Sequence, residues 1–260
     1  MATTTFTPSM LRGAGTRGIP EIPAGSSFTN TYSFDFDGAD DFINCGNISG
    51  LNGGLTEATW MGWFKRESNG FFYMMGTYGT GQIQFFGMQA NGYVTAYAAT
   101  SAGGQRTMAK ANKTWSLNEW YHIAFVYDES ESSNADKMKI YIDGILQANA
   151  VAGAALTSLH SSTANFNIGR LTGATTNEYN GKIDEVAIFT SAKSASDITT
   201  IYNSGTPSNL ASFSPLSWWR MGEKATWDGS NWTLVDQGSG GNNGTSNNMI
   251  EADREEDTPT

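Results

Sequence analysis

Apolar and polar residues alternate along many short segments of the chain between residues 32 and 189. The clearest alternation runs through residues 32–37, 120–128 and 137–144. Alternation places successive side chains on opposite faces of an extended chain, so each segment predicts a β-strand with one buried face. Further segments of this kind are residues 59–65, 70–75, 82–86, 92–97, 165–170 and 181–189. Glycine, asparagine or a polar loop separates them, so the pattern predicts roughly ten to thirteen strands in an antiparallel sandwich or a barrel.

A helical period replaces the alternation after residue 193. Ser194 and Asp197 have the spacing of a capping box, which closes the N-terminus of a helix. Ile198 and Ile201 repeat at helical spacing, and Gly205 stands where a left-handed residue often ends a helix. The sequence therefore predicts one short helix of about three turns.

No periodic pattern occurs at either end of the chain. Residues 1–31 are rich in Thr, Ser, Gly and Pro, and such a segment alone buries too little surface to offset its ordering entropy. We therefore expect an extended N-terminal arm over residues 1–31. Residues 251–260 are acidic and unpatterned, which predicts a tail, while residues 206–250 contain a strand pattern at 218–222.

The composition narrows the class of protein. The 260 residues include 30 glycines, only 15% are charged, and the formal net charge is -10. Because the few Lys and Arg residues form no cluster, we expect no binding to nucleic acid. No run of about twenty apolar residues occurs, so insertion into a membrane is not predicted either. Cys45 is the single cysteine, which excludes an internal disulfide and predicts a small buried side chain.

Four stretches resemble, in this order, the laminin-G-like domains of the concanavalin A-like superfamily. They are residues 33–42 (SFDFDGADDF), 120–127 (WYHIAFVY), 140–144 (IYIDG) and 181–189 (GKIDEVAIF) with the helix that follows. Each stretch is unspecific alone, but the ordered set is characteristic and covers residues 32–205. The resemblance implies an antiparallel β-sandwich of the jelly-roll type, with one short helix and the extended arm.

A further element of that family stands in an unusual place. Many members begin with a strand and a glycine-rich loop that resemble residues 218–223 (WWRMGE) and 236–244 (DQGSGGNNG), which here follow the domain. Three explanations are open: a circular permutation, a truncated second repeat, or a strand swapped with a neighbouring subunit. Permutation is favoured because the termini of sandwich domains often lie close together. Residues 206–250 are then expected to complete the sandwich.

Catalysis is the main alternative, because glycosidases share this superfamily. Their chemistry needs two carboxylates about 5 Å apart, which an E-x-D-x-x-E spacing holds on one strand. Glu251, Asp253 and Glu256 match that spacing, but they lie in the unpatterned tail. Asp184 and Glu185 are adjacent in a predicted strand, so we expect them to point to opposite faces. We therefore predict that the protein is not an enzyme.

The two histidines give no catalytic signature. His122 shares a predicted strand face with Trp120, Ala124 and Val126, which favours a half-buried core histidine. His160 lies in a Ser-rich loop. No Ser or Cys partner follows from the pattern of either residue.

Calcium is the metal that the chain is best suited to bind. The resemblance implies a structural calcium ion near the end of the segment 181–189, which makes Asp184 the first candidate ligand. Asp37 is the second candidate, and Asp40 and Asp236 are weaker ones, since hard cations prefer carboxylate and carbonyl oxygens. The alternative for Asp37 and Asp40 is an Asx turn around Gly38.

Carbohydrate binding would use exposed aromatic rings beside hydrogen-bonding loop residues. Candidate rings neighbour the Gly- and Asn-rich turns, and ordinary packing is the alternative for each of them. They are Tyr78, Tyr93, Trp115 and Tyr179, with Tyr97 and Trp227 as further possibilities.

Two functions remain. The first is a virion structural protein of a phage: a homo-oligomeric capsid-decorating, fibre or tail-associated subunit. Its arm would bind other virion subunits and its sandwich would contact host-surface glycans. Three features favour this virion function: the unpatterned arm, the lack of a standard secretion signal at the N-terminus and the missing disulfides. The resemblance adds that such domains are frequent in phage particles. The second is a free bacterial carbohydrate-binding or adhesion module, located outside the cell or on its surface.

Overall fold

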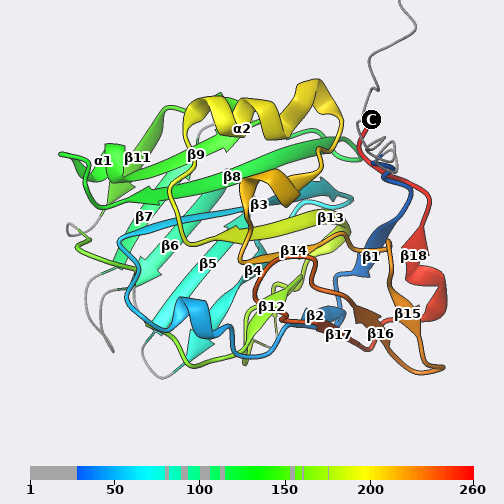
Figure 1. The fold of residues 1–260 in the computed structure, drawn as a ribbon. Coiled ribbons are helices and arrows are strands. Elements are labelled where there is room, and N and C mark those ends of the chain that lie inside the picture. Colours follow the sequence, from blue (N-terminus) through cyan, green and yellow to red (C-terminus); the bar gives the residue numbers. More distant parts are fainter. Residues whose placement is uncertain are drawn as a thin grey trace, which may run out of the picture.

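The structure, a computed structural model, describes residues 28–79, 82–88, 93–99, 106–111, 115–152, 156–159, 161–174 and 176–260. Two antiparallel β-sheets are stacked on each other, and the main helix lies across the outer side of one of them (Figure 1). This confirms the antiparallel β-sandwich that the resemblance implies, which is one of the two architectures that the alternation left open. The predicted arm falls outside the described residues except for residues 28–31. No helix in the described part is long and apolar enough to cross a membrane.

The first sheet has eight strands in the order β10-β9-β8-β3-β13-β1-β18, with β14 paired to β13. Its strands are β1 (Ser33–Asp37), β3 (Glu57–Arg66), β8 (Trp120–Asp128), β9 (Met138–Ile142), β10 (Ile145–Leu146), β13 (Asn180–Phe189), β14 (Ser217–Trp219) and β18 (Arg254–Glu255). β3 and β13 have ten residues each and pair along most of their length. They form the centre of this sheet.

The second sheet has ten strands in the order β11-β7-β6-β5-β4-β12-β2-β17-β16-β15. Its strands are β2 (Phe42–Asn44), β4 (Phe72–Gly79), β5 (Gln82–Met88), β6 (Val94–Ala99), β7 (Arg106–Ala111), β11 (Asn149–Ala152), β12 (Phe166–Ile168), β15 (Thr226–Trp227), β16 (Trp232–Leu234) and β17 (Gly244–Asn247). Strands from both ends of the sequence meet in it.

Apolar side chains from the facing sides of the two sheets form the main core. Phe34 and Ile183 from the first sheet and Ile43 and Phe166 from the second are fully buried there. Each such side chain stabilises the fold by roughly 1.5–3 kcal/mol relative to exposure. Cys45 lies in the same core, which confirms the prediction of a small buried thiol.

A second, smaller apolar layer lies on the outer side of the eight-stranded sheet. The helix α2 (Ala195–Tyr202) packs Ile198 and Ile201 into a cluster with Met61 and Ala187 of the sheet. The outer side of this sheet is therefore largely covered. The other helical turns within the described residues are α1 (Asn134–Lys137), η2 (Ser49–Leu51), η3 (Asn203–Gly205), η4 (Leu210–Phe213) and η5 (Glu251–Asp253).

The start of α2 follows the sequence pattern and its end differs slightly. Ser194 and Asp197 form the predicted capping box. The left-handed stop begins at Asn203, with φ 49°, and continues at Ser204, so the helix ends two residues before the predicted Gly205. Asparagine tolerates the left-handed region better than most residues, which explains the earlier stop.

Residues 206–250 contribute to both sheets of their own chain. β14 pairs with β13, and β17 pairs with β2. Figure 1 shows the orange and red C-terminal strands beside the blue N-terminal ones. The segment that resembles a displaced family element thus pairs with strands of its own chain in this structure.

The prediction of an unpatterned tail is wrong for residues 251–260. Glu255 in β18 pairs with Ser33 of β1. Asp257 accepts hydrogen bonds from Lys65 Nζ at 2.8 Å and from Trp120 Nε1 at 3.1 Å. The acidic residues of this segment form ion pairs with lysines that are distant in the sequence. The local sequence pattern alone therefore did not predict that the segment is part of the sheet.

Candidate functional site

A β-bulge in β13 brings two carboxylates together. The pairing of β13 with β3 shifts between Asp184 and Ala187, and Glu185 has a left-handed φ of 48°. A bulge inserts an extra residue and interrupts the alternation of side chains. One carboxylate oxygen from each of Asp184, Glu185 and Glu223 therefore lies within 4.8 Å of the others. The prediction that Asp184 and Glu185 point to opposite faces is wrong, because it assumed a regular strand.

Hydrogen bonds hold the two bulge carboxylates in place. Asp184 Oδ2 accepts from Asn30 Nδ2 at 2.7 Å, and its Oδ1 accepts from the Glu185 N–H at 2.8 Å. Glu185 accepts from Arg220 Nε at 2.9 Å and from Trp218 Nε1 at 2.5 Å. Both carboxylates are buried, with 0% and 3% of their surface exposed.

The N-terminal segment 28–32 covers this acidic cluster. Glu223 Oε1 accepts from the backbone N–H groups of Thr31 and Tyr32, at 2.5 and 3.1 Å. The Phe28 ring lies against the Trp218 ring at 6.2 Å, and the Arg220 guanidinium stands 4.2 Å from the centre of the Phe28 ring. The segment 28–32 is thus held to the eight-stranded sheet by contacts with the acidic cluster and with Arg220.

Burial changes the protonation of the cluster. Loss of solvent, followed by repulsion from Glu185, raises the pKa of Asp184 well above its usual value. Loss of solvent also raises the pKa of Glu185 to about 7, although the charge of Arg220 opposes this shift. The buried pair therefore resists full ionisation unless further positive charge is supplied.

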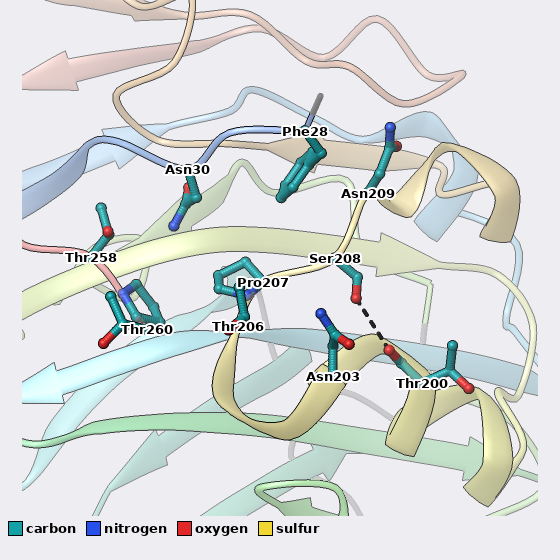
Figure 2. A pocket seen from close by; sticks show the side chains of 11 residues that line it. Phe28, Asn30, Thr200, Asn203, Thr206, Pro207, Ser208, Asn209, Thr258 and Thr260 are labelled. Carbon is teal, nitrogen blue, oxygen red and sulfur yellow. Dashed lines mark hydrogen bonds between the residues drawn. The ribbon is translucent and has the colours of Figure 1, made fainter. Parts of the chain in front are cut away.

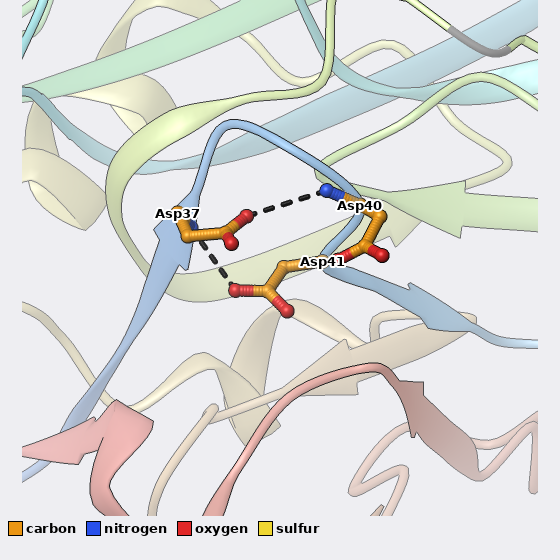
Figure 3. Close-up of side chains that lie close together, drawn as sticks. All are labelled: Asp37, Asp40 and Asp41. Atoms are coloured by element: carbon orange, nitrogen blue, oxygen red, sulfur yellow. Dashed lines mark hydrogen bonds between the residues drawn. The ribbon is translucent and has the colours of Figure 1, made fainter.

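A second acidic group lies in the turn between β1 and β2 (Figure 3). Asp37 Oδ1 accepts from the N–H groups of Ala39 at 2.7 Å and Asp40 at 3.3 Å, around Gly38 with φ 75°. Asp41 Oδ2 accepts from the Asp37 N–H at 3.0 Å, and burial raises the pKa of Asp41 to about 7. The alternative interpretation of Asp37 as the first residue of an Asx turn is confirmed.

Asp236 also has a structural role. Its two carboxylate oxygens accept from the backbone N–H groups of Trp218, Gly238 and Asn242, each at 2.8 Å. It ties β14 to the glycine-rich loop. No oxygen of Asp236 is without an N–H partner.

The predicted aromatic rings divide into two groups. Trp115 and Tyr179 are buried in the core, with 2% and 0% of their surface exposed, so the prediction that they form exposed platforms is wrong. Proximity to a glycine-rich turn does not fix the direction of a side chain. Tyr78 is 44% exposed, and Tyr93 directly precedes Val94, which points into the core. Alternation therefore places Tyr93 on the outer side of the ten-stranded sheet.

The register of the ten-stranded sheet aligns three polar residues with Gly76, Phe85 and Tyr97 in one row, here called the outer-face row. Paired positions link Thr245 to Asn44, Asn44 to Asn167, and Asn167 to Gly76. Pairing through β5 continues the row to Tyr97. Most of the chain neighbours of these residues lie in the core, so the row faces away from it.

Of this row, only Tyr97 was a predicted binding residue; the polar residues Thr245, Asn44 and Asn167 were missed. Asn167 is 3% exposed, and its Oδ1 has no hydrogen-bond partner among the described residues. Gly76 is the residue paired with Asn167 on β4, and it has no side chain. The alternation of residues 165–170 already places Asn167 opposite to Phe166 and Ile168, and this signal could have identified it.

A pocket of 540 Å³ lies beside the covered acidic cluster (Figure 2). Phe28 and Asn30 line one side, the loop after α2 lines another, and Thr258 and Thr260 complete it. Its lining consists of hydroxyl, amide, proline and phenyl groups, without a charged side chain. A neighbouring pocket of 550 Å³ shares Phe28 and adds Trp218 and Arg220.

Comparison with known proteins identifies the family. The family model Laminin_G_3, described as the concanavalin A-like lectin/glucanases superfamily, matches residues 37–199. This chain belongs to that superfamily. No curated protein sequence is significantly similar to it.

Solved structures share the concanavalin A-like fold at low sequence identity. One is a protein from Bacteroides ovatus ATCC 8483 for which carbohydrate binding is proposed: TM-score 0.63, 19% identity, covering 89% of this chain and 62% of that protein. Another is the CBM40 module of the Ruminococcus gnavus IT-sialidase bound to α2,3-sialyllactose: TM-score 0.51, 12% identity, covering 65% of this chain and 96% of the module. These likenesses show the fold.

The acids of the β13 bulge and those of the C-terminal segment do not form an accessible catalytic pair in this concanavalin A-like domain. Asp184 and Glu185 are close enough together, but they are buried beneath the segment 28–32. Glu251, Asp253 and Glu256 span η5 and the two-residue β18, and no regular strand holds them. A glycosidase needs both carboxyl groups at the sugar, which neither group of acids offers in this structure.

The acidic cluster at the bulge fits a calcium ion in its chemistry. Asp184, Glu185 and Glu223 offer carboxylate oxygens at a spacing that calcium, with ligands at about 2.3–2.6 Å, is able to bridge. Glu223 Oε2 and Asn30 Oδ1 are buried oxygens without a partner among the described residues. The turn of Asp37 fits less well, because none of its carboxylates offers a buried oxygen without a partner among the described residues.

Proposed function

We propose that this concanavalin A-like domain is a non-enzymatic protein that binds glycans through the outer side of its ten-stranded sheet. The outer-face row is the observation that carries the proposal. It combines Asn and Thr side chains, which hydrogen-bond to sugar hydroxyls, with the ring of Tyr97, against which the apolar face of a sugar packs. Tyr78 and Tyr93, both predicted as ligand-binding residues, lie on the same side of the sheet.

Similar proteins give the proposal independent support. The Bacteroides ovatus protein is described in terms of carbohydrate binding, and the Ruminococcus gnavus module was solved with a sialylated sugar. The polar side chains of the row, Thr245, Asn44 and Asn167, carry no charge. We therefore expect neutral saccharides to bind better than acidic ones.

The test is a glycan array followed by calorimetry with the best neutral oligosaccharide. We expect Tyr78→Ala and Tyr97→Ala each to weaken binding by about 10-fold, which corresponds to about 1.4 kcal/mol. Ile145→Ala is the control, because Ile145 is 65% exposed on β10 of the other sheet. Equal affinities for all variants, or no glycan bound on the array, would contradict the proposal.

We also propose that the cluster of Asp184, Glu185 and Glu223 holds a structural calcium ion, with Asn30 as a further oxygen ligand. Such an ion would supply the positive charge that the buried pair lacks and would fix the segment 28–32 to the bulge.

Calcium should raise the melting temperature, and a chelator should lower it. Asp184→Asn should abolish this difference, while Asp37→Asn should preserve it. Identical melting with calcium and with chelator would refute a site in this cluster.

The biological setting that we propose is a phage virion, in which the domain is a homo-oligomeric structural subunit and its arm binds other virion subunits. The anchoring of Phe28 on Trp218 and Arg220 supports it, because an arm that precedes residue 28 starts from a fixed point. The alternative setting is a free bacterial module outside the cell.

Deletion of residues 1–27 separates the two settings. In a virion, the shortened protein should fold and bind glycans but fail to enter particles. Normal incorporation into particles would contradict a role of the arm in assembly.

A further inference from the structure

A buried arginine stands at the end of β3 without a carboxylate partner. Arg66 follows Phe64 and Lys65 in the alternation, so it points between the two sheets, and it is 4% exposed. Its Nη1 donates to Asn69 Oδ1 at 2.7 Å and its Nη2 donates to the carbonyl of Trp115. The Nε atom is buried and has no acceptor among the described residues.

The charge of Arg66 is not neutralised by any acid that the structure describes. No ion pair of the described residues includes it, and the nearby carboxylates of Asp35 and Glu67 pair with Lys182 instead. Between residues 80 and 175, the short segments that the structure does not describe contain neither Asp nor Glu. Burial lowers the pKa of Arg66, and only tyrosines oppose this shift. An isolated buried cation is costly unless an anion accompanies it.

Two further donors near Arg66 lack partners. Trp115 Nε1 and the Tyr179 hydroxyl are both buried and have no hydrogen-bond partner among the described residues. Trp115 is joined to Arg66 through its carbonyl, and Arg66 lies close enough to Tyr179 to act on the pKa of its hydroxyl. Both rings belong to the core cluster into which Arg66 points.

We propose that Arg66, Trp115 and Tyr179 form a buried binding site for a monovalent inorganic anion such as chloride. An anion accepts hydrogen bonds from the guanidinium, the indole and the hydroxyl together, and it neutralises the arginine. A water molecule accepts from two donors at most and brings no negative charge to neutralise the arginine. The site is independent of glycan binding.

Crystals grown in sodium bromide give the direct test. Bromide replaces chloride and scatters anomalously, so we expect an anomalous peak between Arg66 Nε, Trp115 Nε1 and the Tyr179 hydroxyl. A water molecule at this position without an anomalous signal would overturn the proposal.

Thermal unfolding gives a test in solution. A ligand that binds only the folded state at about ten times its dissociation constant raises the melting temperature of a protein of this size by roughly 3–5 °C. We expect that difference between sodium chloride and sodium gluconate at equal ionic strength. Tyr179→Phe, which keeps the ring, should reduce it, and Arg66→Met should abolish it.

The control is Arg170→Met, which removes a half-buried arginine that stacks on Phe42 at 4.2 Å. This variant should retain the difference between the two salts. If Arg66→Met does not fold, Tyr179→Phe still decides the question. Equal melting of the natural protein in the two salts would refute the site.

Discussion

His122 shows how a single residue couples the fold to pH. The imidazole is 1% exposed on the outer side of the eight-stranded sheet, beneath the rings of Trp63 at 5.2 Å and Tyr202 at 6.2 Å. Its Nδ1 has no hydrogen-bond partner among the described residues. Loss of solvent lowers the pKa of His122 to about 3. The histidine is thus more deeply buried than the half-buried position predicted from its strand, and it stays neutral.

Protonation of His122 should destabilise the protein as the pH falls. The unfolded chain binds the proton near pH 6.5 and the folded chain only near pH 3, so stability decreases between these values as the pH is lowered. Between pH 7 and pH 5 we expect a loss of about 2 kcal/mol in the free energy of unfolding from this group. Urea unfolding of the natural protein and of His122→Phe at both pH values measures it. An equal pH dependence of both proteins would show that His122 does not contribute.

At the scale of elements, the edge of the eight-stranded sheet is held by charged side chains. β18 is only two residues long, but Lys182 on β13 pairs with Glu255, Glu67 and Asp35, at 3.2, 2.9 and 3.6 Å. Asp257 binds Lys65 at 2.8 Å. A partly buried network of this kind contributes more than isolated surface pairs do.

Removal of β18 should therefore destabilise the sandwich measurably. Deletion of residues 254–260 removes Glu255 and Asp257 and leaves Lys182 and Lys65 with fewer partners. We expect a loss of about 2 kcal/mol, which lowers the melting temperature of a protein of this size by roughly 4–8 °C. Deletion of residues 258–260 is the control, because it keeps β18 and Asp257. If both deletions lower the melting temperature equally, the network is not the cause.

At the scale of the whole molecule, the two proposed binding functions lie on opposite outer sides of the sandwich. The acidic cluster belongs to the bulge of β13 in the eight-stranded sheet, and the outer-face row belongs to the ten-stranded sheet. The main core separates them. The two sites share no residue, and the packed core lies between them, so neither is expected to control the other.

Glycan binding should therefore not depend on calcium. We expect Asp184→Asn to leave the affinity for the best neutral oligosaccharide unchanged within about two-fold, in the presence or absence of chelator, since distant sites act independently. Calorimetry on the natural protein and the variant measures this. A large loss of affinity on chelation would instead place the glycan beside the acidic cluster.

Local patterns in the sequence determined most of the fold. Alternation along residues 32–37 and 120–128 depends only on the geometry of one strand, so it predicted both strands correctly. It predicted a single buried face, however, whereas β8 is buried on both faces because α2 and its neighbours cover the outer side. The capping box of Ser194 and Asp197 is equally local and was also correct. The family resemblance was recognisable for the same reason, since each of its stretches is one strand or turn.

Contacts between distant segments decided the rest. The bulge at Glu185 arises from the mismatch of β13 with β3, and it turned two carboxylates toward each other against the alternation rule. Which strands become neighbours also decided that Trp115 and Tyr179 are buried. The same holds for the pairing of Asn167 with Gly76. A sequence specifies which side chains a strand presents to each face, but only the packed sheets determine what lies opposite, because register and burial are properties of pairs of strands.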